Sequence, residues 1–395
     1  MNLTSEDGCI GRLSHVAAIA IEPNRPECRS WLSGGMPYVG LTALASMMIY
    51  QPMATGTTKL TIRDVAIAAG VSTGTVSRVL NANVTVRPDV RRKVQRAIDE
   101  LGFAPNAVAR SMRSRSTHTI GCILREINIP QLAGFVKAAH DALDEEGFSL
   151  VISNSEGREA RERELLSGLS SRQADGVMMG PYTPIEADFE IFLRGLKIPI
   201  VLIDRDAPEW ADAVMADHAG GMRAAVSHLL DLGHRRIALI TGEHGLYPAS
   251  ERIRGYREAF AAKGIEFDPS LVHSGSFLPG AGFRITSAIL GQRNPPTAVI
   301  AGGLDMLSGV LRAVRGRDLR IPEDVSVIAS GYSELSELVT PPIAVIGWDQ
   351  GEIGRIAAGM LLDRIRSRTP LESRRVLVPS QFIVRASVAA PKRFT

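Results

Sequence analysis

The sequence predicts a mixed α/β protein in which a small three-helix domain precedes a larger domain made of two doubly wound α/β lobes. Three short helical patterns lie between residues 61 and 102. From Thr119 onward, apolar strand-like runs alternate with amphipathic helices, which is typical of parallel sheets covered by helices on both faces. The length of 395 residues predicts two or three domains.

Residues 1–58 show no sustained periodicity and are interrupted by glycine, proline and serine, so we expect a disordered extension there. Met53 shortly precedes the first clear helix pattern. We therefore hypothesise that translation naturally begins at or near Met53. Mass spectrometry of the native N-terminus tests this hypothesis, and a peptide from residues 1–50 would refute it.

Each of the three helical patterns carries a start or stop signal. A threonine with an aspartate three residues later forms a capping box, a serine caps the second helix, a proline suits a first turn, and glycines follow two helices. These signals are Thr61 with Asp64, Ser72, Pro88, Gly70 and Gly102. The tight turn between the first two helices predicts a helix-turn-helix unit.

The second helix of this unit is expected to expose short polar side chains and one arginine. These positions are Thr73, Gly74, Thr75, Ser77, Arg78 and Asn81. Such a composition suits a helix that enters a major groove, where Arg78 can pair bidentately with a guanine and the hydroxyls can bind phosphates or bases. The alternative is an ordinary three-helix domain that binds no nucleic acid.

The charge distribution also points to this end of the chain. Residues 58–118 hold 11 basic and 4 acidic side chains, whereas the remainder holds 34 basic and 38 acidic ones. A basic module beside a mildly acidic body indicates that one end meets a polyanion. A solvated basic helix face is the alternative interpretation.

The larger part contains eight predicted strands and seven predicted helices. The strands are Thr119–Leu124, Phe148–Ser153, Gly176–Met179, Ile198–Asp204, Ile237–Thr241, Ala298–Ala301, Val325–Ala329 and Ala344–Trp348. The helices cover residues 131–146, 158–172, 218–232, 252–263, 281–291, 305–315 and 350–366.

Several classes of protein are disfavoured by what the sequence lacks. The three cysteines have no metal-type spacing, which fits a reducing cytosol. No apolar run approaches the roughly 20 residues that span a membrane. We find no dinucleotide fingerprint, P-loop or nucleophile elbow, so we expect no enzyme activity, no cofactor and no metal site. The eight histidines are interpreted as solvated or packing residues.

A series of ordered motifs runs from residue 59 to about residue 390. They include Thr61–Ala66, Val76–Asn81, Glu100–Asn106, Ala109–Met112, Val201–Arg205, Leu232–Ile237, Arg252–Tyr256, Ile321–Val327, Thr340–Pro342 and Val384–Ser387. Together they resemble the lac repressor/purine repressor (LacI/GalR-type) family of transcription regulators. The resemblance implies a helix-turn-helix domain over 59–104, a hinge over 105–118, and a periplasmic-binding-protein-like body over 119–395 whose two lobes are joined by three crossovers.

The resemblance also implies a function. It predicts a cytoplasmic, nucleoid-associated repressor that binds a palindromic operator in double-stranded DNA as a homodimer. A small metabolite, a sugar or sugar acid, is expected to control it from the cleft between the lobes. The hinge is expected to fold on DNA and to place an apolar side chain in the minor groove. The implied DNA-binding residues are Thr61, Ser72, Thr73, Thr75, Ser77, Arg78, Asn81, Arg110, Met112 and Arg113.

Three residues match effector-binding positions of the family: Asp204 after a strand, Arg252 opening a helix, and Phe277 on a loop. Each also has a structural interpretation. Asp204 can cap the following loop, Arg252 can bridge to Glu251 or Glu258, and Phe277 can serve packing alone.

Three further cleft residues, Gln131, Ser333 and Glu334, lie where this chain departs from the usual family motifs. Because several polar groups that bind sugars in the family are altered here, a common hexose is disfavoured as the effector. A sugar acid or another small anion would suit Arg252, and an unliganded repressor stays open. Whether the ligand releases DNA or promotes DNA binding stays open as well.

Three other functions compete with a ligand-controlled repressor. A transport solute-binding protein would need a signal peptide and no helix-turn-helix, and an enzyme would need one of the missing motifs. A nucleoid architectural protein would explain the basic segment but not the large domain. A gel shift on random and genomic DNA distinguishes the last alternative, because an architectural protein shows no sequence preference.

Overall fold

The structure, a computed structural model, describes residues 60–80, 85–103, 116–182 and 184–392. The chain forms two units that divide after Phe103, and each is described by itself. The predicted extension over residues 1–58, with Met53, lies outside the described residues.

The first unit consists of three helices around a small apolar core. The helices are α1 (Ile62–Ala69), α2 (Thr73–Leu80) and α3 (Pro88–Leu101). The buried core residues are Val65, Ala66, Val76, Val79, Val94 and Ala97. Each helix contributes two of these side chains, so the core depends on all three helices being present.

The predicted helix signals of this unit are confirmed. The backbone nitrogen and Oγ1 of Thr61 both donate to Asp64 Oδ2, at 2.8 and 2.7 Å. Gly70 and Gly102 follow α1 and α3 with φ of +62° and +61°, the left-handed conformation that favours glycine after a helix. Pro88 occupies the first position of α3.

The second unit contains two six-stranded sheets with matching strand orders. The first sheet runs β11 (Arg375–Val378), β5 (Asp212–Ala216), β4 (Ile200–Ile203), β3 (Gly176–Met179), β1 (Thr119–Leu124), β2 (Ser149–Asn154). The second runs β12 (Gln381–Ile383), β10 (Ala344–Gly347), β9 (Ser326–Ser330), β8 (Ala298–Gly302), β6 (Ile237–Thr241), β7 (Val272–Ser274). All pairs are parallel except β10 with β12.

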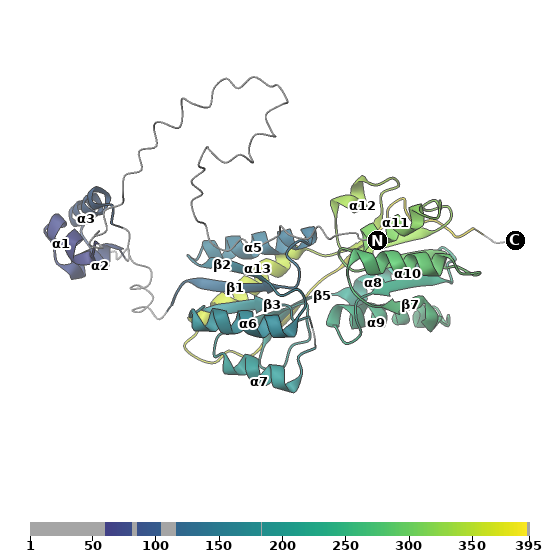
Figure 1. The fold of residues 1–395 in the computed structure, drawn as a ribbon, viewed down its shortest axis with the longest axis horizontal. Helices are drawn as coiled ribbons and strands as arrows, with labels where there is room; N and C mark the ends of the chain where they lie inside the picture. The colour runs from purple at the N-terminus through teal and green to yellow at the C-terminus, as the bar shows by residue number, and fades with distance from the viewer. Residues whose placement is uncertain (1–59, 81–84, 104–115, 183, 393–395) are drawn as a thin grey trace, which may run out of the picture. The chain divides into compact units, whose positions relative to one another are not determined.

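Helices cover both faces of each sheet, as predicted. In the first lobe, α5 (Ala133–Asp144) and α13 (Gln350–Arg366) lie on one face, and α6 (Glu159–Ser171) and α7 (Ala187–Gly195) on the other (Figure 1). In the second, α8 (His218–Asp231) and α9 (Tyr247–Ala262) lie opposite α10 (Pro279–Leu290) and α11 (Leu307–Arg315). The short α12 (Glu334–Leu338) and two 3-10 turns, Pro130–Leu132 and Pro269–Leu271, complete the described elements.

The described chain passes between the lobes three times. The crossovers join β5 to α8, β10 to α13, and β11 to β12. Each lobe is therefore assembled from segments that are far apart in the sequence. Ligands in parallel sheets bind beyond the carboxyl ends of the strands, and both sheets direct such ends toward the loops that join the lobes.

Some predicted element boundaries were wrong. The strands β5, β7, β11 and β12 and the helices α7 and α12 were not predicted. The strand β5 is buried on both faces and begins with a charged residue, Asp212, so it shows no alternation, and its apolar run is only four residues long. The helix α9 begins at Tyr247 rather than at residue 252 because Pro248 suits its first turn. Arg252 therefore lies in the second turn and does not open the helix.

Among the described residues, no helix is both long and apolar enough to cross a membrane.

Candidate functional site

The α2 helix presents a small polar surface. Thr73, Gly74 and Arg78 are exposed, whereas Thr75 and Ser77 are half-buried. The Ser72 hydroxyl accepts a hydrogen bond from the Thr75 backbone nitrogen at 3.1 Å and lies 2.9 Å from Thr75 Oγ1. These two hydroxyls therefore stabilise the helix start and leave Arg78 as the longest polar side chain on the exposed face.

The two neighbouring helices of the unit carry exposed cations: Arg63, Arg92, Lys93 and Arg96. Thr61, another predicted contact, is exposed but engages Asp64. The predicted DNA-binding residues Asn81, Arg110, Met112 and Arg113 lie outside the described residues. The described part of the surface is thus polar, cationic and free of acidic side chains on α2.

In the second unit, one cavity brings together Asp204, Arg252 and Phe277. It has a volume of about 150 Å³ and lies between the lobes, because residues that follow β1 and β4 face residues of α9 and the β7–α10 loop. This volume is below the usual size of a pocket for a drug-sized ligand. The cavity therefore suits a small molecule.

Asp204, whose side chain is 24% exposed, is hydrogen-bonded in series with the buried residues His218 and Arg252. The His218 Nε2 atom lies 2.9 and 2.8 Å from the two carboxylate oxygens of Asp204, and Arg252 Nη2 lies 3.2 Å from His218 Nδ1. A guanidinium can only donate, so Nδ1 accepts and the proton of the neutral ring lies on Nε2, facing Asp204. His218 thus fixes the positions of both flanking groups.

Burial and charge set the protonation states of these three side chains. Burial lowers the pKa of His218 and, with the Arg252 charge, outweighs the attraction of Asp204, so the ring is neutral near pH 7. Burial raises the pKa of Asp204, but its hydrogen bond from His218 and the charges of Arg205 and Arg252 hold that pKa below the ordinary value. Burial also lowers the pKa of Arg252 to about 10, so the guanidinium stays charged.

The contacts of Arg252 and Asp204 differ from the purely structural roles that the sequence also allows. Arg252 bonds neither Glu251 nor Glu258, because both acids pair with Arg254. Asp204 has a left-handed φ of +53° and accepts a hydrogen bond from the Ala216 backbone nitrogen as well as from His218. It therefore anchors the first crossover rather than only its own loop.

Phe277 has both a packing and a lining position. Its ring lies so close to the backbone that a Cβ at Gly242 or Gly303 would come within 2.1 or 2.8 Å of ring carbons. These glycines admit the ring into the wall of the cavity. The guanidinium carbon of Arg252 lies 5.7 Å from the Phe277 ring centre and 5.9 Å from that of Trp348, which is within the range of a cation–π contact.

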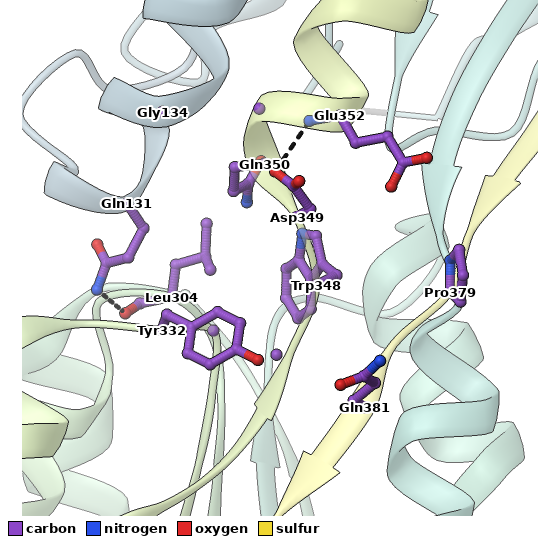
Figure 2. A pocket seen from close by; sticks show the side chains of 13 residues that line it. Gln131, Gly134, Leu304, Tyr332, Trp348, Asp349, Gln350, Glu352, Pro379 and Gln381 are labelled. Carbon is purple, nitrogen blue, oxygen red and sulfur yellow. Dashed lines mark hydrogen bonds between the residues drawn. The ribbon is translucent and has the colours of Figure 1, made fainter.

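The structure does not bring Gln131, Ser333 and Glu334 into this cavity. Gln131 lines a neighbouring hollow beside the crossovers, where its Nε2 donates to the Leu304 carbonyl at 2.8 Å (Figure 2). Ser333 and Glu334 line a further hollow with Gln131, and the Ser333 hydroxyl accepts from the Ser336 backbone nitrogen as a helix cap. Trp348 borders both the hollow in Figure 2 and the inner cavity.

Two residues of the cavity wall, Arg125 and Trp348, were not predicted as effector residues, nor was His218, which bonds the wall residues Asp204 and Arg252. His218 was interpreted as solvated or packing, yet it is 1% exposed and bonds Asp204. No local signal marks it, because it follows the unpredicted strand β5. Arg125 and Trp348 line the cavity. Arg125 directly follows β1 and could have been found by the strand-end rule that singled out Asp204.

Both units have counterparts in known proteins. Residues 61–106 match the sequence profile of bacterial regulatory proteins of the lacI family, and residues 226–388 match a periplasmic binding protein-like domain. The ribose operon repressor of Escherichia coli (strain K12) is 34% identical over 325 residues, which cover 81% of this chain and 97% of that repressor. The chain belongs to the LacI family.

Other LacI-family members are similar to this chain over most of its length. The regulator CelR of Thermobifida fusca is 36% identical over 338 residues, 83% of this chain and 98% of CelR. A solved CelR–cellobiose complex has a TM-score of 0.63 at 33% identity and covers 83% of this chain. A lac repressor dimer bound to operator and the anti-inducer ONPF has a TM-score of 0.73 at 26% identity, covering 84% of this chain and 99% of that one.

Membership of the LacI family identifies this chain as a transcriptional regulator and not an enzyme. The predicted fold class, a helix-turn-helix unit followed by a two-lobed periplasmic-binding-protein-like domain, is confirmed. Of the predicted effector-binding residues, Arg252 is the most deeply buried, with 3% of its surface exposed.

Proposed function

We propose that this LacI-family regulator is a transcriptional repressor that binds a palindromic operator as a homodimer and responds to a small metabolite, a sugar or sugar acid. The observation that carries this proposal is the combination, in one chain, of a polar, cationic helix-turn-helix surface and a cavity between the lobes with a buried guanidinium. The lac repressor dimer with its operator and the CelR–cellobiose complex support it.

In this proposal the domains divide as 59–104 for DNA binding, 105–118 for the hinge and 119–395 for effector binding and dimerisation. The α2 helix enters the major groove, and two copies read the two halves of the operator. Thr61, Ser72, Thr73, Thr75, Ser77, Arg78 and Asn81 contact the operator major groove and phosphates, and Arg110, Met112 and Arg113 contact it from the hinge. The protein acts in the bacterial cytoplasm, associated with the nucleoid.

The cavity supplies the regulatory half of the proposal. Asp204, Arg252 and Phe277 bind the effector, and Gln131, Ser333 and Glu334 line the outer part of the cleft. A ligand that contacts both lobes favours one lobe arrangement over another, so effector and operator affinities are coupled, by about 1–3 kcal/mol in typical systems. The coupling is reciprocal, so operator DNA changes the effector affinity by the same factor.

The experiment has two steps. Genome-wide footprinting of the purified full chain first identifies the operator, and fluorescence anisotropy then compares wild type with Arg78→Ala on that operator and on single-base variants. If Arg78 contacts a guanine, its removal costs about 1–3 kcal/mol at that base pair and relaxes the preference there.

Arg96→Ala is the matched control, because Arg96 is an exposed cation on α3 outside the polar surface of α2. It is expected to weaken binding to all sequences alike, since a phosphate contact carries no base preference. The proposal fails if the wild-type protein protects no defined chromosomal site. An unchanged base preference in Arg78→Ala would remove Arg78 from the reading surface.

A further inference from the structure

The inner cavity contains buried hydrogen-bond donors that no protein atom accepts. The Nη1 of Arg252, the Nε of Arg125 and the Nε1 of Trp348 lack a partner, and all three residues line this cavity. Arg252 is 3% and Trp348 5% exposed. A buried donor without an acceptor is costly, and each one in a native protein calls for an explanation. A bound ligand that supplies acceptors would provide it.

Several hydrogen-bond acceptors on the same wall already receive hydrogen bonds from protein donors. Both oxygens of Asp204 face His218 Nε2, and one of them also accepts from the Ala216 backbone nitrogen. The Leu304 carbonyl accepts from Gln131. Asp305 is the other carboxylate of the cavity wall. Asp305 and the Gln350 amide oxygen are the side-chain acceptors of the wall that remain. An ionised carboxylate only accepts hydrogen bonds, whereas each hydroxyl of a neutral sugar also needs an acceptor for its own hydrogen.

The wall also carries an excess of positive charge. Three guanidiniums, those of Arg125, Arg205 and Arg252, line the cavity against the two carboxylates of Asp204 and Asp305. Burial lowers the pKa of Arg205, Asp204 and Glu162 offset part of this shift, and the neighbouring Arg125 lowers the pKa further. Burial also lowers the pKa of Arg252, Asp204 offsets part of this shift, and the Arg205 charge lowers the pKa further. Arg205 thus lies within electrostatic range of both Arg125 and Arg252, and an anion bound beside these cations would relieve their repulsion.

We propose that the effector is a small anion, with a carboxylate or phosphate group on a hydroxylated carbon skeleton, and that Arg125 is a specificity-determining residue for it. Arg125 and Arg252 donate to the acidic group, Trp348 provides a further donor, and Asp305 accepts from a hydroxyl. The cavity volume of about 150 Å³ restricts the ligand to the size of a monosaccharide derivative. This inference deepens the proposed function and rests on it.

Matched pairs of ligands test the inference on the full-length protein. D-gluconate and D-glucitol differ in one carboxylate, and glucose 6-phosphate and D-glucose differ in one phosphate. Thermal shift and calorimetry are expected to show that at least one anion binds at least about tenfold more tightly than its neutral partner, as a charge-assisted hydrogen bond implies. The two pairs distinguish a carboxylate ligand from a phosphate ligand.

Variants then assign the preference to Arg125. Arg125→Gln is expected to weaken anion binding by about 10- to 100-fold and to leave the neutral partner unchanged. Arg125→Lys keeps the positive charge and is expected to retain the anion preference in part. Arg172→Gln is the control for charge alone, because Arg172 is exposed at the end of α6 in the same lobe. It is expected to bind like wild type.

The inference is overturned if no anion binds more tightly than its neutral partner, or if Arg125→Gln binds like Arg172→Gln. Operator binding is measured in the same samples. Intact operator binding together with tight binding of a neutral sugar would reject the anionic ligand and leave the proposed repressor standing. Absence of any operator would reject the proposed function itself, whatever the ligand results.

Discussion

At the scale of single residues, the composition of α2 governs what the helix can read. Gly74 lies on its exposed face, where a Cβ would meet only the Ser72 hydroxyl, at an ordinary contact distance of 3.7 Å. No steric requirement therefore holds a glycine at this position. Gly70, four residues earlier, differs because its φ of +62° favours glycine.

This contrast gives a prediction for two alanine substitutions. Gly74→Ala is expected to raise the stability of the first unit by about 0.5–1 kcal/mol, because alanine has the higher helix propensity. Gly70→Ala is expected to lower it by about 1–2 kcal/mol, because a Cβ is unfavourable in the left-handed region. Thermal unfolding followed by circular dichroism measures both, and destabilisation by Gly74→Ala would contradict the open space beside it.

At the scale of elements, an ion cluster joins three segments of the first lobe that are distant in the sequence. The Asp212 carboxylate at the start of β5 is fully buried and accepts from Arg364 Nε and Nη2 of α13, both at 2.7 Å. It also accepts from the Arg374 backbone nitrogen, just before β11, at 2.7 Å. Burial raises the pKa of Asp212, but these bonds outweigh burial and hold the pKa below its ordinary value.

Removal of one member of this cluster leaves a poorly solvated charge. Asp212→Ala is therefore expected to lower the free energy of unfolding by about 3–5 kcal/mol. Asp188→Ala is the control, because Asp188 pairs with Arg163 but its side chain is 75% exposed, and surface pairs contribute about 0–1 kcal/mol. Urea unfolding measures both free energies. Equal destabilisation by the two substitutions would show that the buried Asp212 cluster stabilises the protein no more than a surface ion pair.

At the scale of the whole second unit, a further hydrogen bond links the lobes, in addition to those of Asp204 with His218 and of Gln131 with Leu304. The Tyr182 hydroxyl, after β3, donates to Glu243 Oε1, after β6, at 2.6 Å. The guanidinium carbon of Arg125 lies 4.2 Å from the Tyr182 ring centre. Burial, together with Glu243, raises the pKa of Tyr182 to about 12, so the hydroxyl keeps its proton at neutral pH.

A double-mutant cycle tests this link. Tyr182→Phe and Glu243→Ala are expected to be non-additive in the free energy of unfolding by about 0.5–1.5 kcal/mol, the net contribution of one hydrogen bond. Glu243→Gln retains an acceptor and is expected to preserve most of the coupling. Simple additivity of the two single substitutions would show that the hydrogen bond does not stabilise this lobe arrangement.

Two buried histidines make the stability of the second unit depend on pH. Burial lowers the pKa of both His218 and His234. Below about pH 6.5 the unfolded histidines take up protons while the folded ones stay neutral, so unfolding becomes more favourable as the pH falls. The urea midpoint is therefore expected to fall between pH 7.5 and pH 5.5.

His234→Gln is expected to make that pH dependence shallower, because glutamine does not titrate. His140→Gln is the control, since the His140 side chain is 54% exposed. The interpretation is wrong if wild type shows no loss of stability on acidification, or if the two variants change the slope equally.

The sequence by itself determined the features that depend on neighbours along the chain. The capping box of Thr61, the turn at Gly70 and the helix start at Pro88 are local, because each involves residues within a few positions. The alternation of strands and helices likewise predicted two doubly wound lobes. Residues directly after strands, such as Asp204, could be singled out because parallel strands end at a common edge.

Only the tertiary structure decided the features that depend on segments distant in the sequence. The strand β5 is a strand because β4 and β11 flank it and Arg364 neutralises its first residue. His218 supports the cavity wall because the first crossover places it between Asp204 and Arg252, which line the cavity. Gln131 and Ser333, which the sequence grouped with them, line other hollows. The physical reason is that donors, acceptors and charges act through space, and the three crossovers set those distances.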